Sequence, residues 1–157
     1  MSGFRRGVRL GIDVGRARIG VARSDPDGML AVPVETVPRS GTSIERIAQL
    51  ADEYAPLELV VGLPVNMRGE DTASTTDARG FAVELGRRTG LPVRLVDERL
   101  STVTANAALR SSGRTQRNSR SIVDQIAAVV LLQQAIDTEK STGNPAGAVV
   151  PLDEESI

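Results

Sequence analysis

The spacing of apolar residues changes near residue 40, and this change limits the chain to a mixed fold of strands and helices. Before residue 40, apolar side chains alternate with small or polar ones, most clearly over residues 8–14. A period of two is typical of β-strands, and the Asp-Pro-Asp-Gly sequence at 25–28 is a strong turn signal. We assign Asp25 and Asp27 to that turn and not to catalysis. The pattern predicts three antiparallel strands, over residues 7–14, 17–24 and 29–37.

After residue 40, helical spacing alternates with short apolar runs. The runs predict strands at 57–62 and 93–97, and the helical patterns predict helices at 43–54, 74–89, from 101, and at 121–137. This order predicts an α/β domain with a mixed five-stranded sheet (an antiparallel three-strand meander plus two parallel strands) and helices on both faces. We expect a single domain at residues 1–138 and a disordered acidic tail at residues 139–157.

The chain contains no histidine and no cysteine. These absences exclude a Ser-His-Asp triad, a thiolate nucleophile and a metal site built from imidazole or thiolate. A catalytic metal would need oxygen ligands, which favours Mg²⁺ or Mn²⁺. No dinucleotide fingerprint or P-loop follows a predicted strand. No apolar run approaches the ~20 residues of a membrane span, so we expect a cytoplasmic protein without membrane contact.

Basic charge gathers in one part of the chain. Residues 99–123 contain five arginines and no acidic residue, although the whole chain has a net charge of −1. Such a stretch is typical of a surface that contacts phosphates, and it predicts a nucleic-acid partner. The alternative is a solvated face in a chain that favours arginine, because Lys140 is its only lysine.

Asp13 is the first candidate catalytic carboxylate. It lies at the end of the first predicted strand, two residues after Gly11 and two before Gly15. Strand alternation places Asp13, Gly11 and Arg9 on one face, and glycines leave space for a metal or a substrate backbone. The alternative is a turn-forming aspartate at a strand end.

Two further acids are candidates, each with its own alternative. Glu98 directly follows the last predicted strand, at the end where open α/β sheets bind ligands; the alternative is an acid that precedes a helix or pairs with Arg99. Asp124 lies in the most apolar predicted helix, where a buried charge needs a partner or a metal, or it completes a capping box with Ser121. Three carboxylates converging on one side of the sheet would suit two-metal hydrolysis of a phosphodiester, which needs no imidazole base.

Four segments resemble the motifs of the YqgF (RuvX) family. They are residues 11–22 (GIDVGRARIGVA), 61–67 (VGLPVNM), 97–102 (DERLST) and 123–128 (VDQIAA). The motifs occur in the family's order, and the resemblance covers residues 7–137. The family usually continues the second motif with an Asp-Gly pair, where this chain has Arg68-Gly69, a departure that bears on substrate choice by this loop.

The resemblance implies an RNase H-like fold, which the family shares with Holliday-junction resolvases. It also implies that Asp13, Glu98 and Asp124 are the catalytic acids and that they bind Mg²⁺ or Mn²⁺. Members of the family are regarded as nucleases that process the 5′ end of precursor 16S rRNA, and junction cleavage is an older proposed activity. We therefore expect a hydrolase of ribosome biogenesis that acts on structured nucleic acid.

Basic and polar residues are the expected nucleic-acid contacts, and they are Arg16, Arg18, Asn66, Arg68, Arg114, Arg117 and Arg120. Contacts to phosphates position a substrate without reading its bases, so specificity should come from shape. One alternative function is a resolvase of branched DNA, which would act as a homodimer. Another is a non-catalytic RNA-binding factor in ribosome assembly. An actin-like kinase would need a second domain, for which 157 residues are too few.

Overall fold

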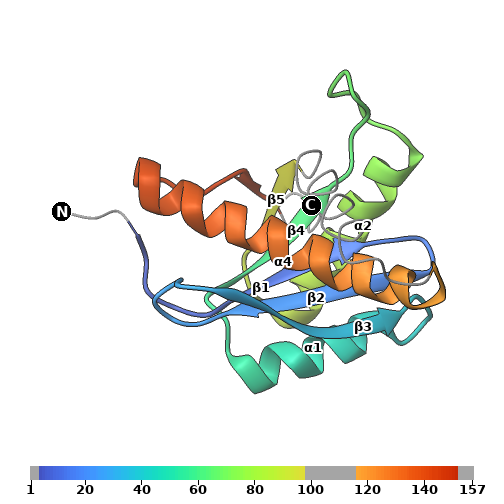
Figure 1. Cartoon of the computed structure of the whole chain (residues 1–157), viewed down its shortest axis with the longest axis horizontal. Coiled ribbons are helices and arrows are strands. Elements are labelled where there is room, and N and C mark those ends of the chain that lie inside the picture. Colours follow the sequence, from blue (N-terminus) through green and yellow to red (C-terminus); the bar gives the residue numbers. More distant parts are fainter. Residues whose placement is uncertain (1–3, 98–115, 152–157) are drawn as a thin grey trace.

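The computed structural model describes residues 4–97 and 116–151, which form one six-stranded sheet between two layers of helices (Figure 1). The elements are β1 (Arg9–Val14), β2 (Arg18–Ser24), β3 (Ala31–Pro38), α1 (Ser43–Tyr54), β4 (Glu58–Leu63), α2 (Ala73–Thr89), β5 (Val93–Asp97), α4 (Gln116–Thr142) and β6 (Ala148–Val149). The strand order is β3-β2-β1-β4-β5-β6, with β1–β3 antiparallel and with β4 and β5 parallel to β1. The predicted meander and parallel pair are confirmed.

One face of the sheet is covered by α4, which runs across it from the orange end to the red end in Figure 1. The apolar residues that α4 buries recur one, three and four positions apart, as expected for a helix with one apolar face. They are Ala127, Ala128, Leu131, Leu132, Ala135 and Ile136. Ile126 and Val130 are only half-buried, so the helix has one buried stripe and is not enclosed on all sides.

The other face carries α1 and α2, which pack against each other and against the main hydrophobic core. Leu10, Ile12 and Val14 of β1 belong to this core. Because successive side chains of a strand point to opposite faces, the remaining residues of β1 point towards α4.

Gly11 brings α4 into close contact with β1. A Cβ atom at this position would lie 2.8 Å from the Cβ of Leu132 and 3.0 Å from the carbonyl oxygen of Ala128. Neither atom is the flexible end of a side chain, so any larger residue would push the helix away from the strand. Gly11 thus faces α4, and the predicted alternation places Arg9 and Asp13 on the same side of the sheet.

A cluster of buried charges fixes the far end of α4 to the sheet. Arg9, which is 1 % exposed, donates to both carboxylate oxygens of Glu139 at 3.1 Å. Arg5 bridges Glu139 and Glu58, and Arg94 donates to Glu58 at 3.2 Å. Burial would raise the pKa of Glu139, but hydrogen bonds from Arg5 and the charges of Arg9 and Arg5 outweigh it and lower that pKa to about 2.

Three features differ from the sequence-based expectations. The helix α4 continues to Thr142, and β6 adds a sixth strand beside β5, so the predicted disordered tail is wrong over residues 139–151. Val150 explains part of this order, because it is 5 % exposed and joins the main core. The helix predicted from residue 101 and residues 152–157 lie outside the described residues.

Candidate active site at the carboxyl end of β1

Asp13 is the penultimate residue of β1 and is half-buried. It pairs with Gly20 of β2, which in turn pairs with Thr36 of β3, so these three residues form one row across the sheet. The helix α4 contacts this row, because the side-chain amide of Gln125 donates to the hydroxyl of Thr36 at 2.8 Å. The row that contains Asp13 therefore lies beneath α4 at residue 125.

Asp124 is the neighbour of Gln125, and its position in α4 follows from that contact. The helix is already formed at Gln116, so Ser121 is not a helix N-cap and the capping-box alternative for Asp124 is wrong. Position 124 is therefore a helical residue next to the contact with Thr36, which lies two strands away from Asp13 in the same row. The structure does not describe the side chains of residues 116–124, which include Asp124, Arg117 and Arg120.

The parallel strands β1, β4 and β5 end at the same edge of the sheet. The last residue of β5 is Asp97, which pairs with Leu63 at the end of β4. Val96, one residue earlier, packs in the core cluster beneath α4. Glu98 and Arg114 lie outside the described residues.

The turn after Asp13 carries two of the predicted basic contacts. The amide of Gly15 donates to the carbonyl of Arg18 at 2.9 Å, which closes a tight turn with Arg16 exposed at its tip. A Cβ atom on Gly15 would lie 2.6 Å from that carbonyl oxygen, so the turn requires glycine here. Arg18 is half-buried as the first residue of β2.

The loop between β4 and α2 projects beyond the sheet (Figure 1), and it carries Asn66 and Arg68. The side-chain oxygen of Asn66 accepts from the amides of Arg68 and Glu70 at 2.9 Å, and its amide donates to the Glu70 carboxylate at 3.0 Å. These contacts give Asn66 a role in shaping the loop, which the sequence did not suggest. Arg68 is exposed.

The sequence did not identify two residues that lie beside the turn after Asp13. Arg39 follows β3 and donates to both carboxylate oxygens of Asp77 in α2 at 2.9 Å, and its side chain also donates to the carbonyl of Gly15 at 3.0 Å. Hydrogen bonding to Asp77 raises the pKa of Arg39, and the reciprocal bond lowers the pKa of Asp77. No local sequence pattern marks this pair, because its members are 38 residues apart.

The candidate donors fit a hard divalent cation in their chemistry. Within residues 4–97 and 116–151, no three His, Cys, Asp or Glu side chains come together in a group that could hold a metal ion. Asp13 is the one predicted ligand whose side chain is described. The proposed donors are all carboxylate oxygens, which suit Mg²⁺ or Mn²⁺.

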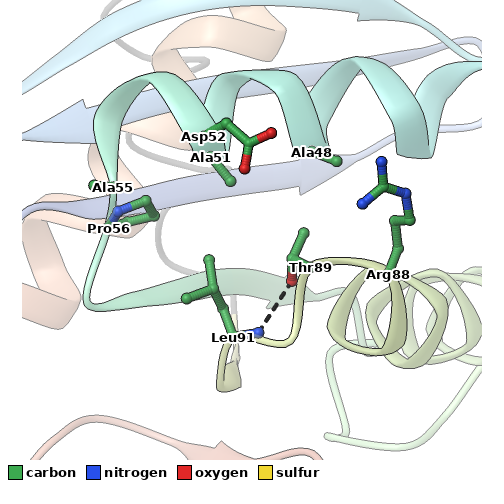
Figure 2. A pocket seen from close by; sticks show the side chains of 8 residues that line it. All are labelled: Ala48, Ala51, Asp52, Ala55, Pro56, Arg88, Thr89 and Leu91. Atoms are coloured by element: carbon green, nitrogen blue, oxygen red, sulfur yellow. Dashed lines mark hydrogen bonds between the residues drawn. The ribbon is translucent and has the colours of Figure 1, made fainter.

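A separate hollow of about 310 Å³ lies between α1 and α2, on the face of the sheet away from α4 (Figure 2). Small and apolar side chains form most of its wall, and Thr89 holds the turn at its edge by accepting from the amide of Leu91 at 3.2 Å. Asp52 is its only carboxylate among the described residues, and Arg88 at its rim pairs with Glu45. This hollow lacks the paired acids that phosphodiester hydrolysis requires.

No helix in the described parts of the chain combines the length and apolar character needed to cross a membrane.

Solved structures share the fold of this chain. A structure described as "T. thermophilus RuvC in complex with Holliday junction substrate" matches with a TM-score of 0.56 and 19 % identity, covering 88 % of this chain and 98 % of the other. A second, "Thermus thermophilus RuvC structure", matches with a TM-score of 0.53 and 18 % identity, covering 88 % and 99 %. The fold is that of the RuvC-like, RNase H-like proteins, as expected.

Sequence comparisons assign this chain to one family. The family model described as "RuvX: Holliday junction resolvase" matches residues 7–138, and the chain belongs to the RuvX family. A curated relative from Clavibacter michiganensis subsp. michiganensis is 56 % identical over 94 % of each chain, and one from Streptomyces avermitilis is 50 % identical over 96 % of this chain and 98 % of its own. Both carry the name "Putative pre-16S rRNA nuclease".

Proposed function

We propose that this chain is a cytoplasmic, metal-dependent nuclease that processes the 5′ end of precursor 16S rRNA. The observation that carries the proposal is the position of Asp13 at the carboxyl end of a central strand, in the row that α4 contacts at Gln125. Open α/β sheets bind their ligands at this end of the strands. Membership of the RuvX family and the name of the curated relatives support the substrate.

The proposed metal ligands are Asp13, Glu98 and Asp124. Glu98 is the residue that follows β5, a strand parallel to β1, and Asp124 precedes the helix residue that contacts the row of Asp13. Bound Mg²⁺ or Mn²⁺ would activate the attacking water and stabilise the leaving oxygen, so the absence of histidine is no obstacle to hydrolysis.

The rest of the proposal concerns how the chain holds its substrate. Arg16 and Arg18 flank the turn after Asp13, and they would bind phosphates close to the cleaved bond. In the arginine-rich stretch, Arg114 precedes α4 in the sequence, and Arg117 and Arg120 belong to the first turns of α4. These contacts would position the nucleic acid, and its shape would supply specificity.

The loop between β4 and α2 would contribute a further contact. Arg68 is exposed on this loop, and the hydrogen bonds of Asn66 fix the backbone that carries it. Asn66 would therefore act on the substrate through the shape of the loop as well as through its own amide.

Cleavage of four-way DNA junctions is a second candidate function. The matching family model is described as that of a Holliday junction resolvase, and the RuvC structure with the shared fold is a complex with a Holliday junction substrate. Both observations favour this alternative. Symmetric cutting of two strands would require a two-fold dimer. A purified chain that sediments strictly as a monomer would therefore argue against junction cleavage.

A cleavage assay on the full chain tests both candidates. The substrates are a labelled precursor 16S rRNA leader, a single-stranded RNA without structure and a four-way DNA junction, each with Mg²⁺, Mn²⁺ or EDTA. We expect cleavage of the leader that EDTA abolishes. Cleavage of the junction alone would transfer the function to DNA. Binding without cleavage of any substrate would contradict the proposal and favour an assembly factor.

A further inference from the structure

A hollow of about 450 Å³ opens at the tip of the β1–β2 turn, and Arg16, Arg39 and Asp77 line it. Asp13 and Arg16 are three residues apart, so their Cα atoms are at most ~11 Å apart. The hollow therefore lies at the same end of the sheet as Asp13, but on the face that α2 covers and not on the α4 face towards which Asp13 points.

Arg39 is held in place from several directions. Its guanidinium makes the two bonds to Asp77 and one to the carbonyl of Gly15, and it lies 4.9 Å from the centre of the Phe81 ring. Its backbone amide donates to the carbonyl of Ala17 at 2.9 Å. The side chain is 23 % exposed, so its outer part reaches the hollow while its bonds fix its position.

These contacts tie the turn to α2. Gly15 and Ala17 are the residues on either side of Arg16, and Arg39 bonds to the carbonyl of each. Asp77 fixes Arg39 through a bidentate ion pair, which is the most directional form of this interaction. The position of Arg16 thus depends on a residue of α2 far away in the sequence.

The charge of the hollow suits an anion. Two guanidinium groups face one carboxylate, and Arg16 is close enough to Asp77 for its charge to contribute to the low pKa of that carboxyl. A guanidinium binds a phosphate through paired N–H groups, and contacts of this kind fix the register of a nucleic acid on a protein.

We propose that this hollow binds one backbone phosphate of the nucleic acid close to the cleaved bond, with Arg16 as the contact and with Arg39 and Asp77 as positioning residues. This inference rests on the proposed function, and it adds a subsite to it. Arg39 and Asp77 act by holding the turn so that Arg16 faces the phosphate.

Asp77→Asn gives the sharpest test, because charge and positioning predict opposite results. Removing a negative charge beside an anion should by itself tighten binding. If Asp77 positions Arg39 and the turn, the variant binds nucleic acid more weakly than the wild type. Asp77→Glu, which keeps the charge and can still reach Arg39, restores part of the affinity.

Arg16→Gln gives a second test that does not depend on folding, because Arg16 is exposed at the turn tip. Loss of one phosphate contact removes about 0.9 from the slope of log K against log salt. The ratio of Kd at 200 mM salt to Kd at 50 mM salt should therefore fall about threefold. Arg88→Gln is the matched control, since it removes an exposed arginine of α2 that pairs with Glu45 away from the site.

The measurement is fluorescence anisotropy of the full chain with a labelled RNA leader and a labelled four-way junction, in EDTA so that no strand is cut. In the cleavage reaction, Arg16→Gln and Asp77→Asn should raise KM and leave kcat unchanged, which loss of folded protein would not do. Asp77→Asn that binds as tightly as the wild type or more tightly, or an Arg16→Gln salt ratio equal to that of Arg88→Gln, overturns the inference alone. A wild type that binds neither nucleic acid overturns the proposed function and the inference together.

Discussion

Replacing Gly11 by alanine would test the contact between β1 and α4 on which the site depends. The new methyl group would lie 2.8 Å from the Leu132 Cβ and 3.0 Å from the Ala128 carbonyl oxygen, both rigid parts of α4. Overpacking of this kind costs about 1–3 kcal/mol, and the stiffer unfolded chain returns about 0.4–1 kcal/mol. The net loss of unfolding free energy is thus between about 0 and 2.6 kcal/mol, and the midpoint of about 1.3 kcal/mol lowers the Tm by about 3–5 °C.

The assay is thermal unfolding followed by circular dichroism, with Gly80→Ala as the matched control. Gly80 is exposed in α2, and nothing lies within 4 Å of a Cβ atom built on it. The same substitution should there raise the unfolding free energy by about 0.5–1 kcal/mol, because alanine favours a helix interior over glycine. If Gly11→Ala also raises the Tm, α4 does not pack on β1 as the structure shows.

Three further predictions concern other parts of the molecule. The folded-state pKa of Glu139 is about 2 against an ordinary 4.5, so its stabilisation is complete above pH 4.5 and is lost as the pH falls towards 2. Glu139 alone should contribute about 3 kcal/mol to the unfolding free energy that urea titrations show to be lost over this window. An unfolding free energy that does not change with pH would contradict the buried cluster. Asn66→Ala should speed amide exchange at Arg68 and Glu70 with little change in Tm, whereas unchanged exchange would mean that other contacts hold the loop. Thr72→Ala removes the capping box of α2 and should lower the Tm by about 2–4 °C, for a loss of about 1 kcal/mol; a Tm equal to that of the wild type would argue against the cap.

The sequence predicted the strands and turns around the candidate site because local patterns encode them. The alternation predicts that Gly11 and Asp13 share one face of the strand, although only the folded structure shows that α4 covers that face, and the turn assigned to Asp25 is confirmed. The Asp25 carboxylate accepts from the amides of Asp27, Met29 and Leu30. Each of these features depends on neighbours within a few residues.

Contacts between distant segments were not predictable in this way. Nothing near Arg39 in the sequence indicates that it meets Asp77 or the Gly15 carbonyl, because the fold alone brings them together. Glu139 looked like the start of an acidic tail, but it is 2 % exposed and neutralises the buried Arg9. The carboxylate of Glu139 is therefore the partner of a buried arginine from a distant segment, and the composition of the tail does not reveal this pairing.

The capping-box alternative for Asp124 failed for a related reason. Ser and Asp three residues apart are typical of a helix start, but the same spacing also occurs inside a helix. The helix α4 is already formed at Gln116, so residue 124 lies inside a long helix, one residue before the contact of Gln125 with Thr36.

The most direct test of the account is the cleavage rate of Asp13→Asn on the precursor rRNA leader with Mg²⁺ or Mn²⁺. Asn keeps the size of the side chain and removes the charge that a metal needs. The matched control is Asp137→Asn, because Asp137 is an exposed aspartate of α4 that accepts from the side-chain amide of Gln133. We predict that Asp13→Asn unfolds at the wild-type temperature and gives no detectable product, while Asp137→Asn cleaves at the wild-type rate. Normal cleavage by Asp13→Asn would contradict the assignment of the active site.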